Sequence, residues 1–148
     1  GKLKEWAKRP LPDVPMHVLH GHTSPVTAVA ASAELDMAAS ASSDGTVLLH
    51  RMTKGRLMRS FSHSCSVDHL LLTRHGELLA HGAADNVLSL SDVNGWPIRK
   101  VSAGDMPATR LALSPDHTLL FVGGEDGGLS ARSAKTLNAC QRFPALHP

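Results

Sequence analysis

The sequence predicts an all-β fold, a partial β-propeller with three complete four-stranded blades plus the second half of a preceding blade. The first observation is a repeat, because Asp44, Asp85 and Asp126 lie 41 residues apart. The second is that each repeat holds four short apolar runs separated by turn residues. A period near 40 residues with four strands per unit is typical of a propeller blade and not of a helical repeat.

Each expected strand alternates apolar with small or polar residues over a short run, which favours strands over helices. Asp-Gly or Asp-Asn stands between the second and third strands of every unit, and these residues tolerate the positive φ of a tight hairpin. The strands are expected at 26–30, 37–41, 46–50 and 57–61, then at 67–72, 78–82, 87–91 and 98–101, and finally at 109–113, 119–123, 129–132 and 137–141.

These strands divide the chain into blades at 21–61, 62–102 and 103–148, all in one incomplete propeller domain. Residues 1–20 are expected to form the last two strands of a truncated blade, interrupted by a Pro-rich insertion at 9–12. An open propeller leaves strand edges and blade faces uncovered. We therefore expect the remaining blades, or a second copy of the chain, to close the ring.

Composition excludes several classes of protein. The formal net charge of +2 argues against a nucleic-acid partner. Cys65 and Cys140 make neither a disulfide framework nor a zinc site, and we expect small buried residues in a reducing compartment. The sequence shows no apolar run long enough to span a membrane and no signal peptide. It also has no Gly-rich phosphate loop, and we expect no cofactor.

Several motifs recur in register and resemble a WD repeat over essentially the whole chain. Gly21-His22 is followed by the run from Ser42 through Asp44-Gly45 to His50, and Trp6 falls where the family has its tryptophan. The later blades are degraded, with Ser62-His63 and Ala103-Gly104 in place of Gly-His and with Ser91 and Arg132 at the tryptophan position. The resemblance implies a non-enzymatic protein–protein interaction scaffold.

Residues 32–50 together with 55–60 resemble more narrowly the C-terminal WD repeats of BEACH-domain, neurobeachin-like proteins. That resemblance implies a large cytoplasmic scaffold in vesicle or lysosome-related membrane traffic, peripheral on intracellular membranes. The alternative is a WD-repeat adaptor subunit of another assembly, such as a ribonucleoprotein or a ubiquitin-ligase complex. Under both hypotheses the partners of this protein are other proteins.

The spacing of His22, Ser40 or Ser42, and Asp44 invites interpretation as a serine–histidine–aspartate set. The WD resemblance implies instead a structural hydrogen-bond network that satisfies buried polar groups and fixes the hairpin. The corresponding members in later blades are His63, Asp85 and Asp126. We therefore expect no catalytic residue and no enzyme.

Two further groups of residues have alternative explanations. His17, His20 and His22, and likewise His63, Cys65 and His69, lack the closely spaced cysteine pairs and four ligands typical of zinc, so no metal site is expected. The basic residues Lys2, Lys4, Lys8 and Arg9 suit either attraction to anionic lipid or a solvated linker.

By the same resemblance, partners bind residues just before each turn aspartate and at the entrance of each first strand. These candidate residues are Ser43, Ala84 and Glu125, then Ser24, Cys65 and Met106. They include no aromatic or arginine anchor of the kind that dominates binding hot spots.

Overall fold

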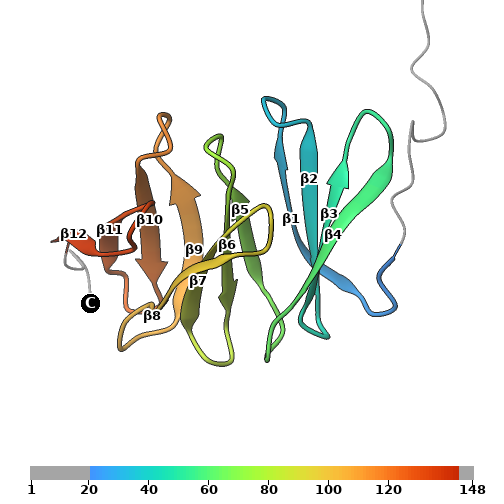
Figure 1. Cartoon of the computed structure of the whole chain (residues 1–148). Coiled ribbons are helices and arrows are strands. Elements are labelled where there is room, and N and C mark those ends of the chain that lie inside the picture. The colour runs from blue at the N-terminus through green and yellow to red at the C-terminus, as the bar shows by residue number, and fades with distance from the viewer. Residues whose placement is uncertain (1–20, 144–148) are drawn as a thin grey trace, which may run out of the picture.

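The computed structural model describes residues 21–143, which form three four-stranded antiparallel sheets in chain order (Figure 1). The first sheet contains β1 (Val26–Ser32), β2 (Met37–Ser42), β3 (Thr46–Arg51) and β4 (Arg56–Ser62). The second contains β5 (His69–Leu72), β6 (Glu77–Gly82), β7 (Val87–Asp92) and β8 (Pro97–Ser102). The third contains β9 (Ala108–Leu113), β10 (Leu119–Gly124), β11 (Leu129–Ser133) and β12 (Ala139–Phe143).

Each sheet is a meander in which spatial order equals chain order, and the sheets stand side by side as blades (Figure 1). The first strands β1, β5 and β9 contact one another in turn, whereas β4, β8 and β12 are outermost. The Thr27 hydroxyl donates to the Val67 carbonyl, and His69 Nε2 donates to the Thr109 carbonyl at 3.1 Å. The all-β propeller prediction is confirmed; the half-blade predicted at 1–20 lies outside the described residues.

Two apolar clusters hold the three sheets together. Alternate residues of a strand point to opposite faces, so Leu78 packs toward the first sheet while Leu79 packs toward the third. Between the first two sheets the cluster includes Ala39, Val47, Leu49, Leu70 and Leu72. Between the second and third it includes Leu88, Leu90, Leu120, Val122 and Leu137. Across residues 21–143 the structure has no helix suited to crossing a bilayer.

The second sheet departs from the 41-residue spacing. His81 pairs with Leu88, whereas Ala41 pairs with Val47 and Gly123 with Leu129, so the β6–β7 hairpin holds one more residue than the other two. Ser40 pairs with Leu48, and its structural counterpart is Ala80, which pairs with Ser89. The extra residue therefore moves His81 to the face that meets the third sheet.

The last strand begins at Ala139, so the prediction of a strand from Leu137 is wrong at that end. Leu137 has φ 61°, and its N–H donates to the Ser133 carbonyl at 2.8 Å within a turn. Its side chain is fully buried in the cluster between the second and third sheets. Leu137 thus packs in the core from a turn. The alternation of apolar and polar residues in the sequence does not distinguish such a turn from a strand.

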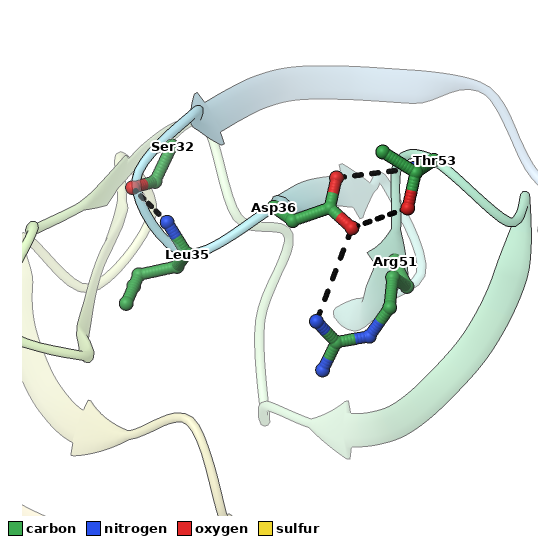
Figure 2. A network of polar contacts seen from close by, with 5 residues as sticks. All are labelled: Ser32, Leu35, Asp36, Arg51 and Thr53. Atoms are coloured by element: carbon green, nitrogen blue, oxygen red, sulfur yellow. Dashed lines mark hydrogen bonds and ion pairs between the residues drawn. The ribbon is translucent and has the colours of Figure 1, made fainter.

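The end of the first sheet shown in Figure 2 is fastened by Asp36. Its Oδ1 accepts the Thr53 N–H at 3.1 Å, and its Oδ2 accepts the Thr53 hydroxyl at 2.5 Å and lies 3.9 Å from Arg51 Nη1. On the other side of the same turn, the Leu35 N–H donates to Ser32 Oγ at 3.3 Å. These contacts tie the β1–β2 turn to the β3–β4 turn.

Candidate interaction surface

The six candidate partner-binding residues lie at one end of the sheets, opposite the Asp36 turn (Figure 1). The Ser43 N–H donates to the Pro25 carbonyl at 3.1 Å, and the Glu125 N–H donates to the Pro107 carbonyl at 3.0 Å. Each of these bonds joins a hairpin to the segment that enters the first strand of the same sheet. We call this end the rim, defined by Ser24, Ser43, Cys65, Ala84, Met106 and Glu125; all are exposed except Ser24 and Cys65, which are half-buried.

The rim is continuous from sheet to sheet. Gly45 has φ 89°, and a Cβ at this position would lie 2.9 Å from the Cys65 carbonyl oxygen and closer still to that of His63. Asn86 Nδ2 donates to the Gly104 and Met106 carbonyls at 3.1 and 3.0 Å, and the Ala108 N–H donates to Asn86 Oδ1 at 3.0 Å. The β2–β3 and β6–β7 hairpins thus pack on the entrance of the next sheet.

In the first sheet the structure brings His22 and Ser40 together. His22 Nε2 lies 2.8 Å from Ser40 Oγ, and His22 Nδ1 lies 3.2 Å from Thr46 Oγ1. The Thr46 hydroxyl donates to Asp44 Oδ1 at 2.6 Å, so Thr46 stands between the histidine and the aspartate. Ser42 Oγ accepts the Asp44 N–H at 3.4 Å. No direct histidine–aspartate bond forms, so the geometry of a serine–histidine–aspartate relay is absent among these described residues.

In the second sheet a different set of residues makes the polar network. Among residues 21–143, His63 forms no side-chain hydrogen bond, and Asp85 Oδ1 accepts only the Val87 N–H, at 3.2 Å. His81, which is almost fully buried, instead places Nε2 2.8 Å from Asn86 Oδ1 and Nδ1 3.0 Å from His69 Nδ1. This network joins the second sheet to the third.

The third sheet retains only the local part of the network. Asp126 Oδ1 accepts the Gly128 N–H at 2.9 Å. Gly104 stands where the earlier blades carry histidine, and a hollow of about 310 Å³ beside it is lined by Val122, Ser130 and Arg142, among others. The side chain that fills this space in the first blade is missing here.

The sequence analysis did not assign Thr46, His81, His69 or Asn86 to the polar network; His69 was considered only as a metal ligand. The hydroxyl two residues after Asp44 is a local signal for Thr46. The contacts of His81, His69 and Asn86 depend on the extra residue in the β6–β7 hairpin, and no local sequence pattern indicates that residue.

The positions where the WD repeat has its tryptophan hold three different side chains, His50, Ser91 and Arg132. His50 is almost fully buried, and Arg132 donates from Nη1 to the Leu137 carbonyl at 3.0 Å. Burial lowers the pKa of Arg132, with a smaller contribution from Arg142.

The expectation that both cysteines are buried is wrong, because Cys65 is half-buried and Cys140 is exposed. No group of three or more metal-ligating side chains occurs in residues 21–143; His17 and His20 lie outside them.

The rim is strongly acidic. Its turns, at 21–25, 43–45, 63–68, 83–86, 103–107 and 125–128, contain no lysine or arginine. Five exposed carboxylates project there, from Asp44, Asp85, Asp105, Glu125 and Asp126. A surface of this charge favours cationic partners over an anionic bilayer.

The carboxylate of Asp44 is held ionised. The Thr46 hydroxyl, followed by the Thr46 N–H, lowers its pKa from 3.8 to about 2. Burial opposes this shift, and the Ser42 and Ser24 hydroxyls add smaller lowering effects. Hydrogen bonds to the charged form favour that form. The stability from this group is present above the unfolded pKa and is lost as the pH falls through the folded pKa.

Thr46→Val is expected to raise the pKa of Asp44 from about 2 toward its ordinary 3.8, because the largest stabilising hydrogen bond is lost. An NMR titration of the Asp44 carboxyl carbon measures this directly. Thr23→Val, on an exposed turn residue, is the control and should leave the titration unchanged. An unchanged pKa in Thr46→Val would contradict the hydrogen-bond assignment.

Two imidazoles, those of His69 and His81, face each other where the second sheet meets the third. His69 Nε2 faces the Thr109 carbonyl and His81 Nε2 faces Asn86 Oδ1, so both Nε2 atoms donate. Only one of the two Nδ1 atoms, 3.0 Å apart, then has room for a proton. Burial lowers the pKa of His69, and the charge of His81 lowers it further, against smaller opposing effects of the Thr109 bond and Asp68.

The chain is therefore expected to lose stability on acidification between about pH 7 and pH 5. The unfolded histidine takes up its proton near pH 6.5, whereas folded His69 takes it up at lower pH, so stability falls as the pH drops through that window. His69→Gln should flatten this slope in urea-unfolding experiments across the window. His75→Gln, an exposed turn histidine, should retain the slope. Equal slopes in both variants would exclude the His69–His81 pair as the cause.

Comparison with known proteins identifies the family. Residues 4–147 match the family described as the neurobeachin beta propeller domain. The chain belongs to this family. BEACH domain-containing protein B of Arabidopsis thaliana is 32% identical over 133 residues, which cover 88% of this chain and 5% of that protein. The chain is thus similar to a small part of a BEACH-domain protein, and the predicted resemblance is confirmed.

Other proteins are similar to this chain in sequence or in structure. The target of rapamycin complex subunit wat1 of Schizosaccharomyces pombe is 26% identical over 140 residues, covering 89% of this chain and 45% of that protein. The computationally designed proteins Ika4 and Ika8 superpose with TM-scores of 0.76 and 0.73 at 20% and 21% identity. These superpositions cover 90% and 88% of this chain, and 81% and 40% of the designed chains. WD propellers of this family are generally non-enzymatic scaffolds that mediate protein–protein interaction.

Proposed function

We propose that the chain is part of a non-enzymatic interaction scaffold in a BEACH-type protein that acts in vesicle or lysosome-related membrane traffic. The observation that carries the proposal is the rim. There the first two hairpins pack on the entrance of the next sheet, and the first and third are bonded to the entrance of their own sheet. A rigid backbone platform with exposed, single-sign charge suits recognition of other proteins, because side chains need little ordering when a partner binds. Membership of the neurobeachin propeller family supports the same role.

The proposal places the protein in the cytoplasm, peripheral on intracellular membranes. The acidic rim is unsuited to face anionic lipid. Membrane association would then come from elsewhere in the protein, and the basic residues Lys2, Lys4, Lys8 and Arg9 are candidates, although they lie outside the described residues.

The open faces of the first and third sheets need a covering partner. Val26 and Val29 of β1, and Leu129 and Phe143 of the third sheet, are exposed apolar side chains. Further propeller blades, or a second copy of this chain, would bury them by the same packing that joins the three sheets.

A second candidate function is that of a WD-repeat subunit in another assembly. The similarity to a target of rapamycin complex subunit supports it, at 26% identity over 89% of this chain. The two functions differ in the neighbours that the protein keeps in cells.

Proximity labelling in cells tests the proposal, with a labelling enzyme fused to the protein that carries these blades. Trafficking proteins should dominate the labelled set, and Glu125→Lys with Asp105→Lys should remove part of it. Glu34→Lys, a single charge reversal at the opposite end, should leave the set unchanged and is the control for each rim substitution made singly. A labelled set dominated by one soluble assembly would favour the second candidate. A set insensitive to the rim variants would contradict the role of the rim.

A further inference from the structure

A groove of about 730 Å³ runs between the outer strands of the first two sheets. β4 forms one wall, and β7 and β8 form the other. Its volume falls within the range typical of ligand sites. The groove is distinct from the rim, since the residues that line it come mainly from the outer strands rather than from the hairpins at one end.

On each wall, one cation and one apolar side chain lie two residues apart on the same face of an outer strand. Arg59 and Phe61 are two residues apart on β4 and share a face, and Phe61 packs against the cluster between the first and second sheets. Ile98 and Lys100 are likewise two apart on β8, where Lys100 pairs with Ser89 and Ile98 is 49% exposed. The groove thus has an apolar centre with a positive charge on either side.

The charge of the groove is of one sign. Arg59, Arg99 and Lys100 are exposed along it, and no aspartate or glutamate lines it. His63 closes one end, where burial first and then the charge of Lys100 lower its pKa, against a smaller effect of Asp85. The imidazole is therefore kept neutral, and the three fixed cations set the charge that a ligand meets.

An exposed tryptophan stands beside the groove. Trp96 is 72% exposed and lines an adjoining hollow with Arg59, Asn94 and Gly95. Asp92 fixes the turn that presents it, because Asp92 Oδ1 accepts the Asn94 and Trp96 N–H groups at 2.9 and 3.0 Å. A Cβ at Gly95 would lie 3.5 Å from the Phe61 ring, so this turn packs on the apolar part of the groove. Tryptophan and arginine together are the residues most enriched in binding hot spots.

We propose that this groove binds an extended acidic peptide segment of a partner protein. Aspartate or glutamate side chains of the peptide pair with Arg59 and Lys100, and an apolar side chain packs between Phe61 and Ile98. β4 and β8 are the outermost strands of their sheets, so an extended backbone also finds unpaired strand edges there. The inference rests on the proposed scaffold function and specifies the chemistry of one class of partner.

Fluorescence of Trp96 provides the first measurement. The chain has two tryptophans, Trp6 and Trp96, so Trp6→Phe leaves Trp96 as the sole reporter. The probe is a short synthetic peptide in which aspartate and glutamate alternate with leucine and phenylalanine. Binding should shift the Trp96 emission to shorter wavelength and weaken as salt screens the cations. A matched peptide with lysine in place of the acidic residues should give no shift.

Variants locate the site. Arg59→Glu and Lys100→Glu are each expected to weaken the peptide roughly tenfold or more in fluorescence anisotropy, because each puts a like charge against it. Lys135→Glu, on a distant exposed turn, makes the same charge change and should alter affinity less than about twofold. Ile98→Ser should weaken binding, while Met106→Ser, on a rim side chain of similar exposure, should not.

Three results in vitro would overturn the proposal. The folded chain could fail to bind the acidic peptide, or Lys135→Glu could weaken binding as much as Arg59→Glu and Lys100→Glu do. The third is binding of anionic phosphatidylserine vesicles that the peptide fails to displace. The last result would assign the cations to a membrane. If the groove variants abolish peptide binding in vitro but leave the labelled neighbours in cells unchanged, the proposed scaffold function stands and the groove inference fails.

Discussion

Leu79→Ala is expected to lower the free energy of unfolding by about 2–5 kcal/mol, the range for a large-to-small change in a packed core. Leu79 is fully buried on β6, pairs with Leu71 and Leu90 across its sheet, and belongs to the cluster between the second and third sheets. The cavity would open between two blades, where the strands on both sides are fixed and collapse is limited. Chemical denaturation followed by circular dichroism measures the loss.

Met106→Ala is the matched control for this effect. Met106 is 44% exposed on the rim, so its truncation should cost less than about 0.5 kcal/mol. If Leu79→Ala is as mild as the control, the second and third sheets do not pack through this face. The register in which His81 and Leu79 both face the third sheet would then be incorrect.

Gly45→Ala is expected to destabilise the chain by about 2–5 kcal/mol, from two separate causes. The left-handed backbone at φ 89° costs an alanine about 1–2 kcal/mol. The new Cβ would in addition press on the carbonyls of His63 and Cys65 at the entrance of the second sheet, and overpacking costs about 1–3 kcal/mol more. Thermal and urea unfolding should both report the loss.

Gly76→Ala separates the two causes. Gly76 has φ 83°, close to that of Gly45, but a Cβ there would meet nothing nearer than Val93 Cγ2 at 3.8 Å. It should therefore show only the cost of the backbone conformation, about 1–2 kcal/mol. Equal losses for the two variants would mean that the first hairpin is not in contact with the second sheet.

The blade architecture could be predicted because its signals are local. Asp-Gly and Asp-Asn hairpins, such as Asp44-Gly45, alternate with short apolar runs, and the turns fall where the sequence indicates. The positive φ of Asn86 and Gly127 follows from the same residues. The ends of strands are harder to predict than the turns, as Leu137 shows, because an apolar side chain can reach the core from a turn.

The polar and charged sites depend on the register in which the strands pair, and the 41-residue spacing of the sequence does not reveal that register. Leu49 pairs with Arg59, but Leu90 pairs with Arg99, so the β7–β8 connection is one residue shorter than its counterpart. Lys100, 41 residues after Arg59, therefore lies on the opposite face of its sheet and meets Arg59 across the groove. The β5–β6 connection is likewise one residue shorter than its counterpart, since Val29 pairs with Ser40 but Leu70 pairs with Ala80. This offsets the extra residue in the β6–β7 hairpin, so β7 keeps the 41-residue spacing while the faces of β6 and β8 change.

The same compensation explains the altered network in the second blade. His63 occupies the position expected of a network histidine but makes no side-chain bond in the described part of the chain, whereas His81 and Asn86 form the contacts. A one-residue shift in a strand exchanges its faces. Repeat spacing alone does not reveal such a shift.

The three sheets are blades of an open propeller, and we propose that further blades or a second copy cover its end faces. Light scattering of the 148-residue chain, combined with circular dichroism, tests it most directly. We predict a β-rich species with at least twice the 15.7 kDa mass of one chain, because Val29 at 71% exposure and the third-sheet face would otherwise remain in water. A stably folded β-rich monomer of 15.7 kDa would contradict the claim, since its end faces would then need no partner.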